Sequence, residues 1–115
     1  MKVFYRLLFL LTLFFQSNAN AQTNATQIAN SKVIVIYGSP DCHYCIDLKK
    51  TLIEKKKRFI FFDIDTNESA LNEMLSKLNK AKISTNNLQI PVVDKYGVMY
   101  VNNASFKDFV DKIVE

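Results

Sequence analysis

Cys42 and Cys45 are the only two cysteines of the 115-residue chain, and they stand three positions apart. An apolar run at residues 33–37 precedes them, and a charged, helix-like run at residues 46–57 follows them. A strand, a short turn and Cys-x-x-Cys at the start of a helix form the arrangement of a redox dithiol. The free N–H groups and the positive dipole end of the first helical turn stabilise a thiolate at Cys42. Cys45 lies one turn later on the same face, so we predict that it can attack a mixed disulfide formed at Cys42.

Three other interpretations of this cysteine pair compete with a redox role. A structural disulfide would close a very small loop, which constrains the unfolded chain little. A closed zinc site needs four ligands, whereas the motif supplies two cysteines and His43, so we predict no metal site. An inert buried pair is disfavoured because Pro40, Asp41 and His43 make the surroundings polar. We therefore predict a catalytic dithiol, with a passive structural bridge as the alternative.

The two residues that flank Cys42 would modify its chemistry. A charged His43 in the first helical turn would favour the thiolate and raise the reduction potential. Alternatively, the His43 ring points into solvent and changes little. The carboxylate of Asp41 would disfavour a nearby thiolate, but we expect Asp41 to act instead as the N-cap of the helix.

Residues 1–21 are predicted to be a secretory signal peptide. Lys2 and Arg6 flank the start of an apolar run at residues 7–15, and Ala19-Asn20-Ala21 gives a small-x-small cleavage pattern. The apolar run is too short to span a bilayer, so we expect no membrane anchor after cleavage. Residues 22–30 would then form a flexible lead-in to one domain at residues 31–115. We expect export to a periplasm or secretion, which places the dithiol in an oxidising compartment.

The charge of the chain does not support binding to nucleic acid. The full sequence carries 15 basic and 11 acidic residues, a formal net charge of +4. Two of the 15 basic residues, Lys2 and Arg6, lie in the predicted signal peptide, so the mature chain has a net charge of only +2. A balance this close to neutral is not the electrostatic footprint of a nucleic-acid-binding domain.

The hydrophobic pattern predicts seven elements in the order β-α-β-α-β-β-α. Strands are expected at residues 32–37, 58–65, 90–94 and 98–101, and helices at residues 42–57, at residues 68–82 and from residue 106 onward. The β-α-β unit requires parallel strands, and a hairpin turn at residues 95–97 adds an antiparallel edge. The prediction is an α/β fold with a mixed four-stranded sheet flanked by helices on both faces.

The spacing of apolar residues predicts how these elements pack. The first two strands are continuous apolar runs, so we expect both to be buried on both faces. Ile53 is expected at the flank of the core-facing side of the first helix. On the second helix, apolar residues recur at helical spacing, whereas Lys77, Lys80 and Lys82 are expected to face water.

The element order, the CHYC motif at residues 42–45 and the Ile90-Pro91 pair just before the hairpin resemble the thioredoxin superfamily, and within it the glutaredoxins most closely. Cys-x-Tyr-Cys is similar to the Cys-Pro-Tyr-Cys of glutaredoxins. The resemblance implies a thioredoxin-like fold from about residue 32, with Cys42 as nucleophile and Cys45 as resolving thiol. It also implies a cis Pro91 packed beside them. A cis Pro91 would leave the backbone of Ile90 free to pair with a substrate strand.

The sequence departs from glutaredoxins at the positions that hold glutathione in that family. Glutaredoxins usually carry a lysine three residues before the first cysteine, and this chain has Ser39 there. Their Gly-Gly pair with a following acidic residue is replaced by VNNAS at residues 101–105. We therefore expect no cofactor beyond a redox-active Cys42–Cys45 disulfide, with glutathione as the alternative.

Together these observations predict an exported thiol–disulfide oxidoreductase that acts on protein or small-molecule disulfides. Its partners would be protein thiols or disulfides and a second redox protein that recycles the dithiol, and we expect a monomer. Two alternatives are a glutathione-dependent reductase of the glutaredoxin type and a non-catalytic thioredoxin-fold binding module with a structural disulfide. The predicted catalytic residues are Cys42, Cys45 and His43, and the predicted substrate-binding residues are Tyr44, Ile90 and Pro91.

Overall fold

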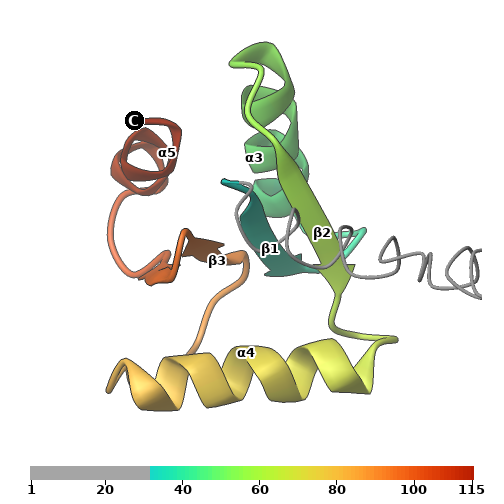
Figure 1. Cartoon of the computed structure of the whole chain (residues 1–115), viewed down its shortest axis with the longest axis vertical. Coiled ribbons are helices and arrows are strands. Elements are labelled where there is room, and N and C mark those ends of the chain that lie inside the picture. Colours follow the sequence, from blue (N-terminus) through green and yellow to red (C-terminus); the bar gives the residue numbers. More distant parts are fainter. Residues whose placement is uncertain (1–31) are drawn as a thin grey trace, which may run out of the picture. The chain divides into compact units, whose positions relative to one another are not determined.

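The computed structural model describes residues 32–115, so the predicted signal peptide and the lead-in at residues 22–30 lie outside the described residues. Along the chain the elements follow the predicted order (Figure 1). They are β1 (Ile34–Gly38), α3 (His43–Glu54), β2 (Phe59–Asp63), α4 (Glu68–Lys80), β3 (Val92–Lys95), β4 (Val98–Val101) and α5 (Phe106–Val114). Among these residues, no helix is both long and apolar enough to cross a membrane.

The four strands form one mixed sheet in the order β2-β1-β3-β4. β1 pairs with β2 in parallel and with β3 antiparallel, and β3 pairs antiparallel with β4. This confirms the predicted α/β fold with its parallel β-α-β unit and antiparallel hairpin. The prediction that both of the first two strands are buried on both faces is wrong for β2. β2 is an edge strand with β1 as its one neighbour, and Ile60 on it is 43% exposed.

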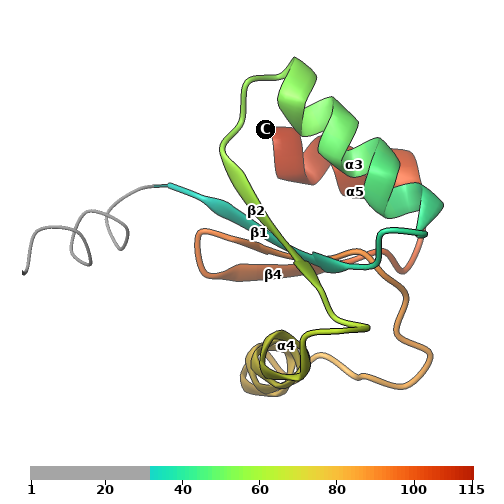
Figure 2. The same cartoon turned by 90° about the vertical axis from the view of Figure 1, so that its right-hand side faces the viewer.

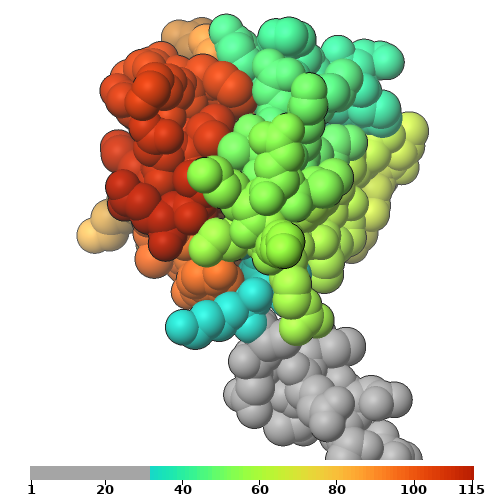
Figure 3. All heavy atoms as spheres, turned by 90° about the horizontal axis from the view of Figure 1, so that it is seen from above, coloured from blue at the N-terminus to red at the C-terminus, as the bar shows by residue number. Residues whose placement is uncertain are grey.

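Helices cover both faces of the sheet, as Figure 2 shows. α3 and α5 lie side by side on one face, where their apolar residues pack with Ile34 and Ile36 of β1 (Figures 2 and 3). α4 covers the other face and packs its buried residues against Tyr37 and Val92. Because side chains alternate along a strand, β1 contributes to both clusters and sits at the centre of the core.

Lys77 of α4 does not face water as predicted, because it lies between the helix and the sheet. Its side chain is 30% exposed, and Nζ lies 2.8 Å from Asp94 Oδ2 on β3 and donates to the Tyr37 hydroxyl at 2.8 Å. That hydroxyl in turn donates to Glu73 Oε2 at 3.1 Å. Burial lowers the pKa of Lys77, but the bonds to Asp94 and Tyr37 outweigh it and raise this pKa above the ordinary value. A long lysine stem can cross apolar surface in this way to reach a carboxylate.

The hairpin between β3 and β4 turns at two residues with positive φ, Tyr96 at 54° and Gly97 at 92°. Two such residues in succession are typical of the tight turns that match the twist of a β-hairpin. The backbone N–H of Gly97 donates to Asp94 Oδ1 at 2.8 Å. Asp94 therefore holds both the turn and Lys77, one with each carboxylate oxygen.

Candidate active site

Cys42 is the N-cap of α3. Its backbone is extended, with φ −78° and ψ 116°, and its Sγ accepts the backbone N–H of Cys45 at 3.1 Å. The sulfur thus takes the place of the oxygen that a serine or aspartate cap provides. Asp41, which was expected to cap the helix, instead donates its own N–H to Ser39 Oγ at 3.4 Å. The expectation fails because the helix begins at His43, one residue later than the sequence suggests.

The far end of α3 is also shorter than the predicted helix. α3 ends at Glu54, and Lys56 has a positive φ of 55°, which stops the helical path before residue 57. Ile53, expected at the flank of the core, is 66% exposed. The buried residues of this helix are Cys45, Leu48 and Leu52.

Cys45 is fully buried, and its sulfur packs against the end of β1. A Cβ added to Gly38 would lie 2.5 Å from Cys45 Sγ and 3.1 Å from Phe61 Cε2, so only glycine leaves room for the sulfur. Burial raises the pKa of the Cys45 thiol to about 12, and the hydrogen bond with Cys42 adds to this rise. Cys45 is therefore protonated at neutral pH, and both cysteines are free thiols in this structure.

The Ile90–Pro91 peptide bond is cis, as the family resemblance implied. Pro91 is fully buried, and the sulfur of Cys42 lies 3.8 Å from the carbonyl oxygen of Ile90. The fold thus brings together two sites that are 48 residues apart in the sequence. The binding roles of Ile90 and Pro91 stay predictions, but both residues lie beside the sulfur that would react.

The side chains of His43 and Tyr44 contact Asp47 and Phe106 respectively. The His43 side chain is 81% exposed, and its Nε2 lies 3.1 Å from Asp47 Oδ2, one turn along α3. The ring of Tyr44 packs on Phe106 at the start of α5, with 4.5 Å between ring centroids. Of the two alternatives for His43, this geometry favours the solvent-facing one, whereas Tyr44 joins α3 to α5 beside the site.

Ser39 occupies the position where glutaredoxins usually carry a lysine, and it is 8% exposed. Its backbone carbonyl accepts the N–H of Cys42 at 3.2 Å, so it helps to form the turn before the helix. The charge of Lys49 partly offsets the rise in the pKa of the Cys45 thiol, and Lys49 Nζ lies 4.1 Å from the centroid of the Phe61 ring. Within residues 32–115, no three His, Cys, Asp or Glu side chains gather in a way that could hold a metal ion.

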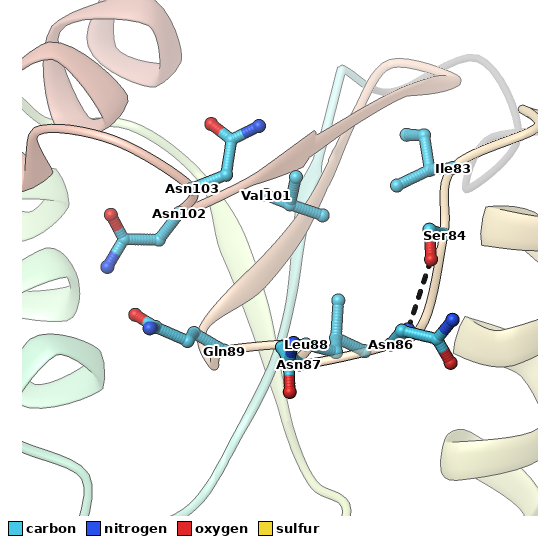
Figure 4. Close-up of a pocket in the computed structure, with 9 residues that line it drawn as sticks. All are labelled: Ile83, Ser84, Asn86, Asn87, Leu88, Gln89, Val101, Asn102 and Asn103. Carbon is cyan, nitrogen blue, oxygen red and sulfur yellow. Dashed lines mark hydrogen bonds between the residues drawn. The ribbon is translucent and has the colours of Figure 1, made fainter.

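A hollow of about 370 Å³ lies between the loop that precedes Pro91 and the stretch that follows β4 (Figure 4). Five side-chain amides line it, those of Asn86, Asn87, Gln89, Asn102 and Asn103. The sequence pointed to Asn102 and Asn103 only as part of the stretch that replaces the Gly-Gly pair, and it indicated neither the hollow nor the contact between Gly38 and Cys45. A glycine at the end of a β-branched run is a signal for such a close approach, whereas nothing local distinguishes Asn102 from an exposed loop residue.

The family model described as Glutaredoxin matches residues 34–97, from the first residue of β1 to the turn before β4. The matched range includes both cysteines and the cis proline. No curated protein matches the chain.

Two solved structures have a similar fold. The thioredoxin-like protein BC3987, in a crystal structure of a mutant, is 20% identical with a TM-score of 0.53, and the match covers 70% of this chain and 92% of that one. The dithiolic glutaredoxin 2-C-Grx1 of Trypanosoma brucei brucei, a solution structure, is 14% identical with a TM-score of 0.52. That match covers 83% of this chain and 99% of the other. At such identities the likeness is evidence for the thioredoxin-like fold alone.

Proposed function

Because this chain belongs to the glutaredoxin family, we propose that it is a thiol–disulfide oxidoreductase in which Cys42 exchanges with substrate disulfides and Cys45 resolves the intermediate. The observation that carries the proposal is the contrast between the two sulfurs. Cys42 is partly exposed at the helix N-terminus beside a cis proline, whereas Cys45 is buried behind it. A nucleophile must be reached by its substrate, and a resolving thiol must be reached by the nucleophile alone.

In the reducing direction, the Cys42 thiol first loses its proton to water, and the resulting thiolate attacks one sulfur of the substrate disulfide. A bond from Cys42 to that sulfur forms, the substrate S–S bond breaks, and the other substrate sulfur leaves as a thiolate. Cys45 then attacks the sulfur of Cys42, the Cys42–Cys45 bond forms, the bond between Cys42 and the substrate sulfur breaks, and the proton of Cys45 passes to that departing sulfur. Two electrons have moved from the dithiol to the substrate, and the oxidising direction is the reverse of these steps.

We propose that the protein works after export, in a periplasm or outside the cell, as a monomer that a second redox protein recycles. Ser39 in place of the usual lysine favours protein disulfides over glutathione as the substrate, because glutathione would lose a cation for its carboxylate. His43 contributes little to the thiolate in this proposal, because its ring pairs with Asp47.

Matched cysteine variants test the assignment of roles. The Cys42→Ser protein is expected to lose exchange with hydroxyethyl disulfide, because the reacting sulfur is gone. The Cys45→Ser protein is expected to accumulate mixed disulfides with its substrates, since no thiol resolves them. Continued turnover by the Cys42→Ser protein would show that the roles are assigned wrongly.

The reduction potential, measured in glutathione redox buffers, tests the function and gives its direction. A value of about −120 to −180 mV indicates an oxidant or isomerase, and about −230 to −270 mV indicates a reductase. A bridge that stays closed below about −300 mV would indicate a structural disulfide in a non-catalytic module, and the proposal would fail.

A further inference from the structure

Lys49 of α3 lies against the sheet. It follows Cys45 by four residues, so the two side chains start from neighbouring positions on one side of the helix. Lys49 is half-buried, whereas the next residue, Lys50, is exposed. The Nζ of Lys49 lies 4.1 Å from the centroid of the Phe61 ring, a distance at which the electron-rich face of the ring attracts a cation. Phe61 of β2 therefore holds the charge of Lys49 in place.

The ring of Phe61 links this charge to the buried thiol. A Cβ added to Gly38 would lie 3.1 Å from Phe61 Cε2 and 2.5 Å from Cys45 Sγ, so the edge of the ring and the sulfur approach the same point at the end of β1. The ring thus has the cation of Lys49 over its face and the sulfur of Cys45 beside its edge. Because Cys45 is fully buried, the field of a charge is screened less at its sulfur than it would be in water.

The resolving step needs a negative charge on Cys45, which its surroundings mostly disfavour. Burial raises the pKa of this thiol, and the hydrogen bond with Cys42 adds to the rise. A hydrogen bond with the backbone of Ser39 and the charge of Lys49 lower the same pKa. Since Cys45 must give up its proton as it attacks Cys42, a cation beside it matters most at this step.

The titratable side chains of the neighbouring strands are directed elsewhere. Tyr37 of β1 and Asp94 of β3 bind Lys77 on the α4 side of the sheet. Asp63 of β2 accepts two hydrogen bonds from the loop that follows the strand. The strands therefore place no free carboxylate beside the sulfur of Cys45 in the described part of the chain.

The charged residues of the helices on this face are at the surface, apart from Lys49. On α3 and in the turn before it, His43 pairs with Asp47, and the other charged residues except Lys49 are exposed. The charged residues of α5 are exposed as well. Within residues 32–115 Lys49 forms no ion pair, so no carboxylate neutralises its charge next to Cys45.

We propose that Lys49 is a positioning residue of the resolving step: its charge, held on the ring of Phe61, stabilises the negative charge that develops on the sulfur of Cys45 as this sulfur attacks Cys42. This inference rests on the proposed function. Lys49 keeps its own proton, so bonds, electrons and protons change as in the exchange described above, and Lys49 affects only the rate of the second step. In the oxidising direction the same charge stabilises Cys45 as the leaving group.

The first test measures the reactivity of Cys45 in the Cys42→Ser protein, where it is the one cysteine of the chain. Alkylation by iodoacetamide is followed by mass spectrometry from pH 7 to 9. Removal of one nearby charge lowers the thiolate fraction about three- to tenfold, and the remaining thiolate is a stronger nucleophile. Lys49→Met, which keeps the length of the side chain, is therefore expected to slow alkylation about two- to fourfold at each pH.

Two matched variants separate charge from structure. Lys49→Arg keeps the charge and is expected to react within about 1.5-fold of the Cys42→Ser parent. Lys50→Met removes the same charge from an exposed neighbouring position, where water and salt screen it, and is also expected to stay within about 1.5-fold. A loosened core would expose the thiol and speed alkylation, so a slower reaction of Lys49→Met cannot come from misfolding.

The second test follows the resolving step in the chain with both cysteines. The reduced protein is mixed with hydroxyethyl disulfide and quenched in acid, and the mixed disulfide and the Cys42–Cys45 disulfide are quantified by mass spectrometry. Lys49→Met is expected to slow closure of the Cys42–Cys45 bond about two- to fourfold, whereas the attack of Cys42 on the reagent changes less than about 1.5-fold.

Any of four outcomes overturns the inference. These are unchanged or faster alkylation in Lys49→Met, an equal loss in Lys49→Arg, an equal loss in Lys50→Met, and equal slowing of the two steps of exchange. If the unmodified protein fails to react with hydroxyethyl disulfide at all, the proposed function fails instead. Because alkylation of Cys45 does not depend on that reaction, the two failures are distinguished.

Discussion

Replacing Gly38 with alanine would test how tightly the sheet holds the buried cysteine. The added methyl group would lie 2.5 Å from Cys45 Sγ and 3.1 Å from Phe61 Cε2, closer than carbon and sulfur pack without a shift. Overpacking of this kind costs about 1–3 kcal/mol. Alanine also lowers the conformational entropy of the unfolded chain, which stabilises the folded state by about 0.4–1 kcal/mol. We therefore expect Gly38→Ala to lower the free energy of unfolding by about 1–2 kcal/mol.

A double-mutant cycle with Cys45→Ala shows whether the sulfur is the cause. Without the sulfur only the contact with Phe61 stays tight, so Gly38→Ala should then cost about 1 kcal/mol less than in the parent chain. Unfolding is followed in urea by far-ultraviolet circular dichroism under reducing conditions, because the chain has no tryptophan. Gly97→Ala is the control. Its cost comes from a φ of +92° with open space around it, and should be equal in both backgrounds. An equal cost of Gly38→Ala in both backgrounds would refute the packing argument.

Two further predictions concern the titrating groups. Lys77→Met should lower stability at pH 7 by about 2 kcal/mol, because Asp94 loses its charged partner, whereas the exposed Lys80→Met should change it by less than about 0.5 kcal/mol. Folding raises the pKa of Lys77, so its stabilisation is complete below the unfolded pKa near about 10.4 and is lost as pH rises through the folded pKa. Urea titrations at pH 7 to 11 should therefore show the two stability curves converging in alkali, and parallel curves would contradict the ion pair. In the Cys42→Ser protein, Cys45 should react with iodoacetamide at pH 8 on the order of 10²- to 10³-fold more slowly than an ordinary cysteine. A normal rate, followed by mass spectrometry, would contradict its burial.

The order of the elements and the hairpin can be predicted from the sequence because they depend on local chemistry. The periodicity of apolar residues, the turn that includes Gly97 and the spacing of the two cysteines can each be recognised within a short stretch of sequence. The status of a strand within the sheet depends instead on pairing between distant segments. The run at residues 59–63 is as apolar as a central strand, yet β2 lies at the edge and leaves Ile60 exposed.

Some features of the site likewise follow from the local sequence, and others depend on segments that are distant in the sequence. The cysteine spacing and the helix that follows it are local, and they predict the place of Cys42 and Cys45. Asp41 and Lys77 are misjudged because residue type alone cannot show which group caps a helix or which lysine reaches a distant carboxylate. Asn102 is buried and lies beside residues 83–89, far away in the sequence, so its burial becomes visible only in three dimensions.

The contact between Lys77 and Asp94 also disfavours a shift in the register of β3 along β1. Asp94 lies opposite Val35 in the antiparallel pair of β1 and β3, on the side that faces α4. If β3 slid by one residue along β1, every side chain on it would change face. The Asp94 carboxylate would then enter the apolar layer under α3 and α5 without a counter-charge, at a cost of several kcal/mol. A salt link on the face remote from the dithiol thus excludes the misaligned sheet in which Pro91 would no longer lie beside Cys42.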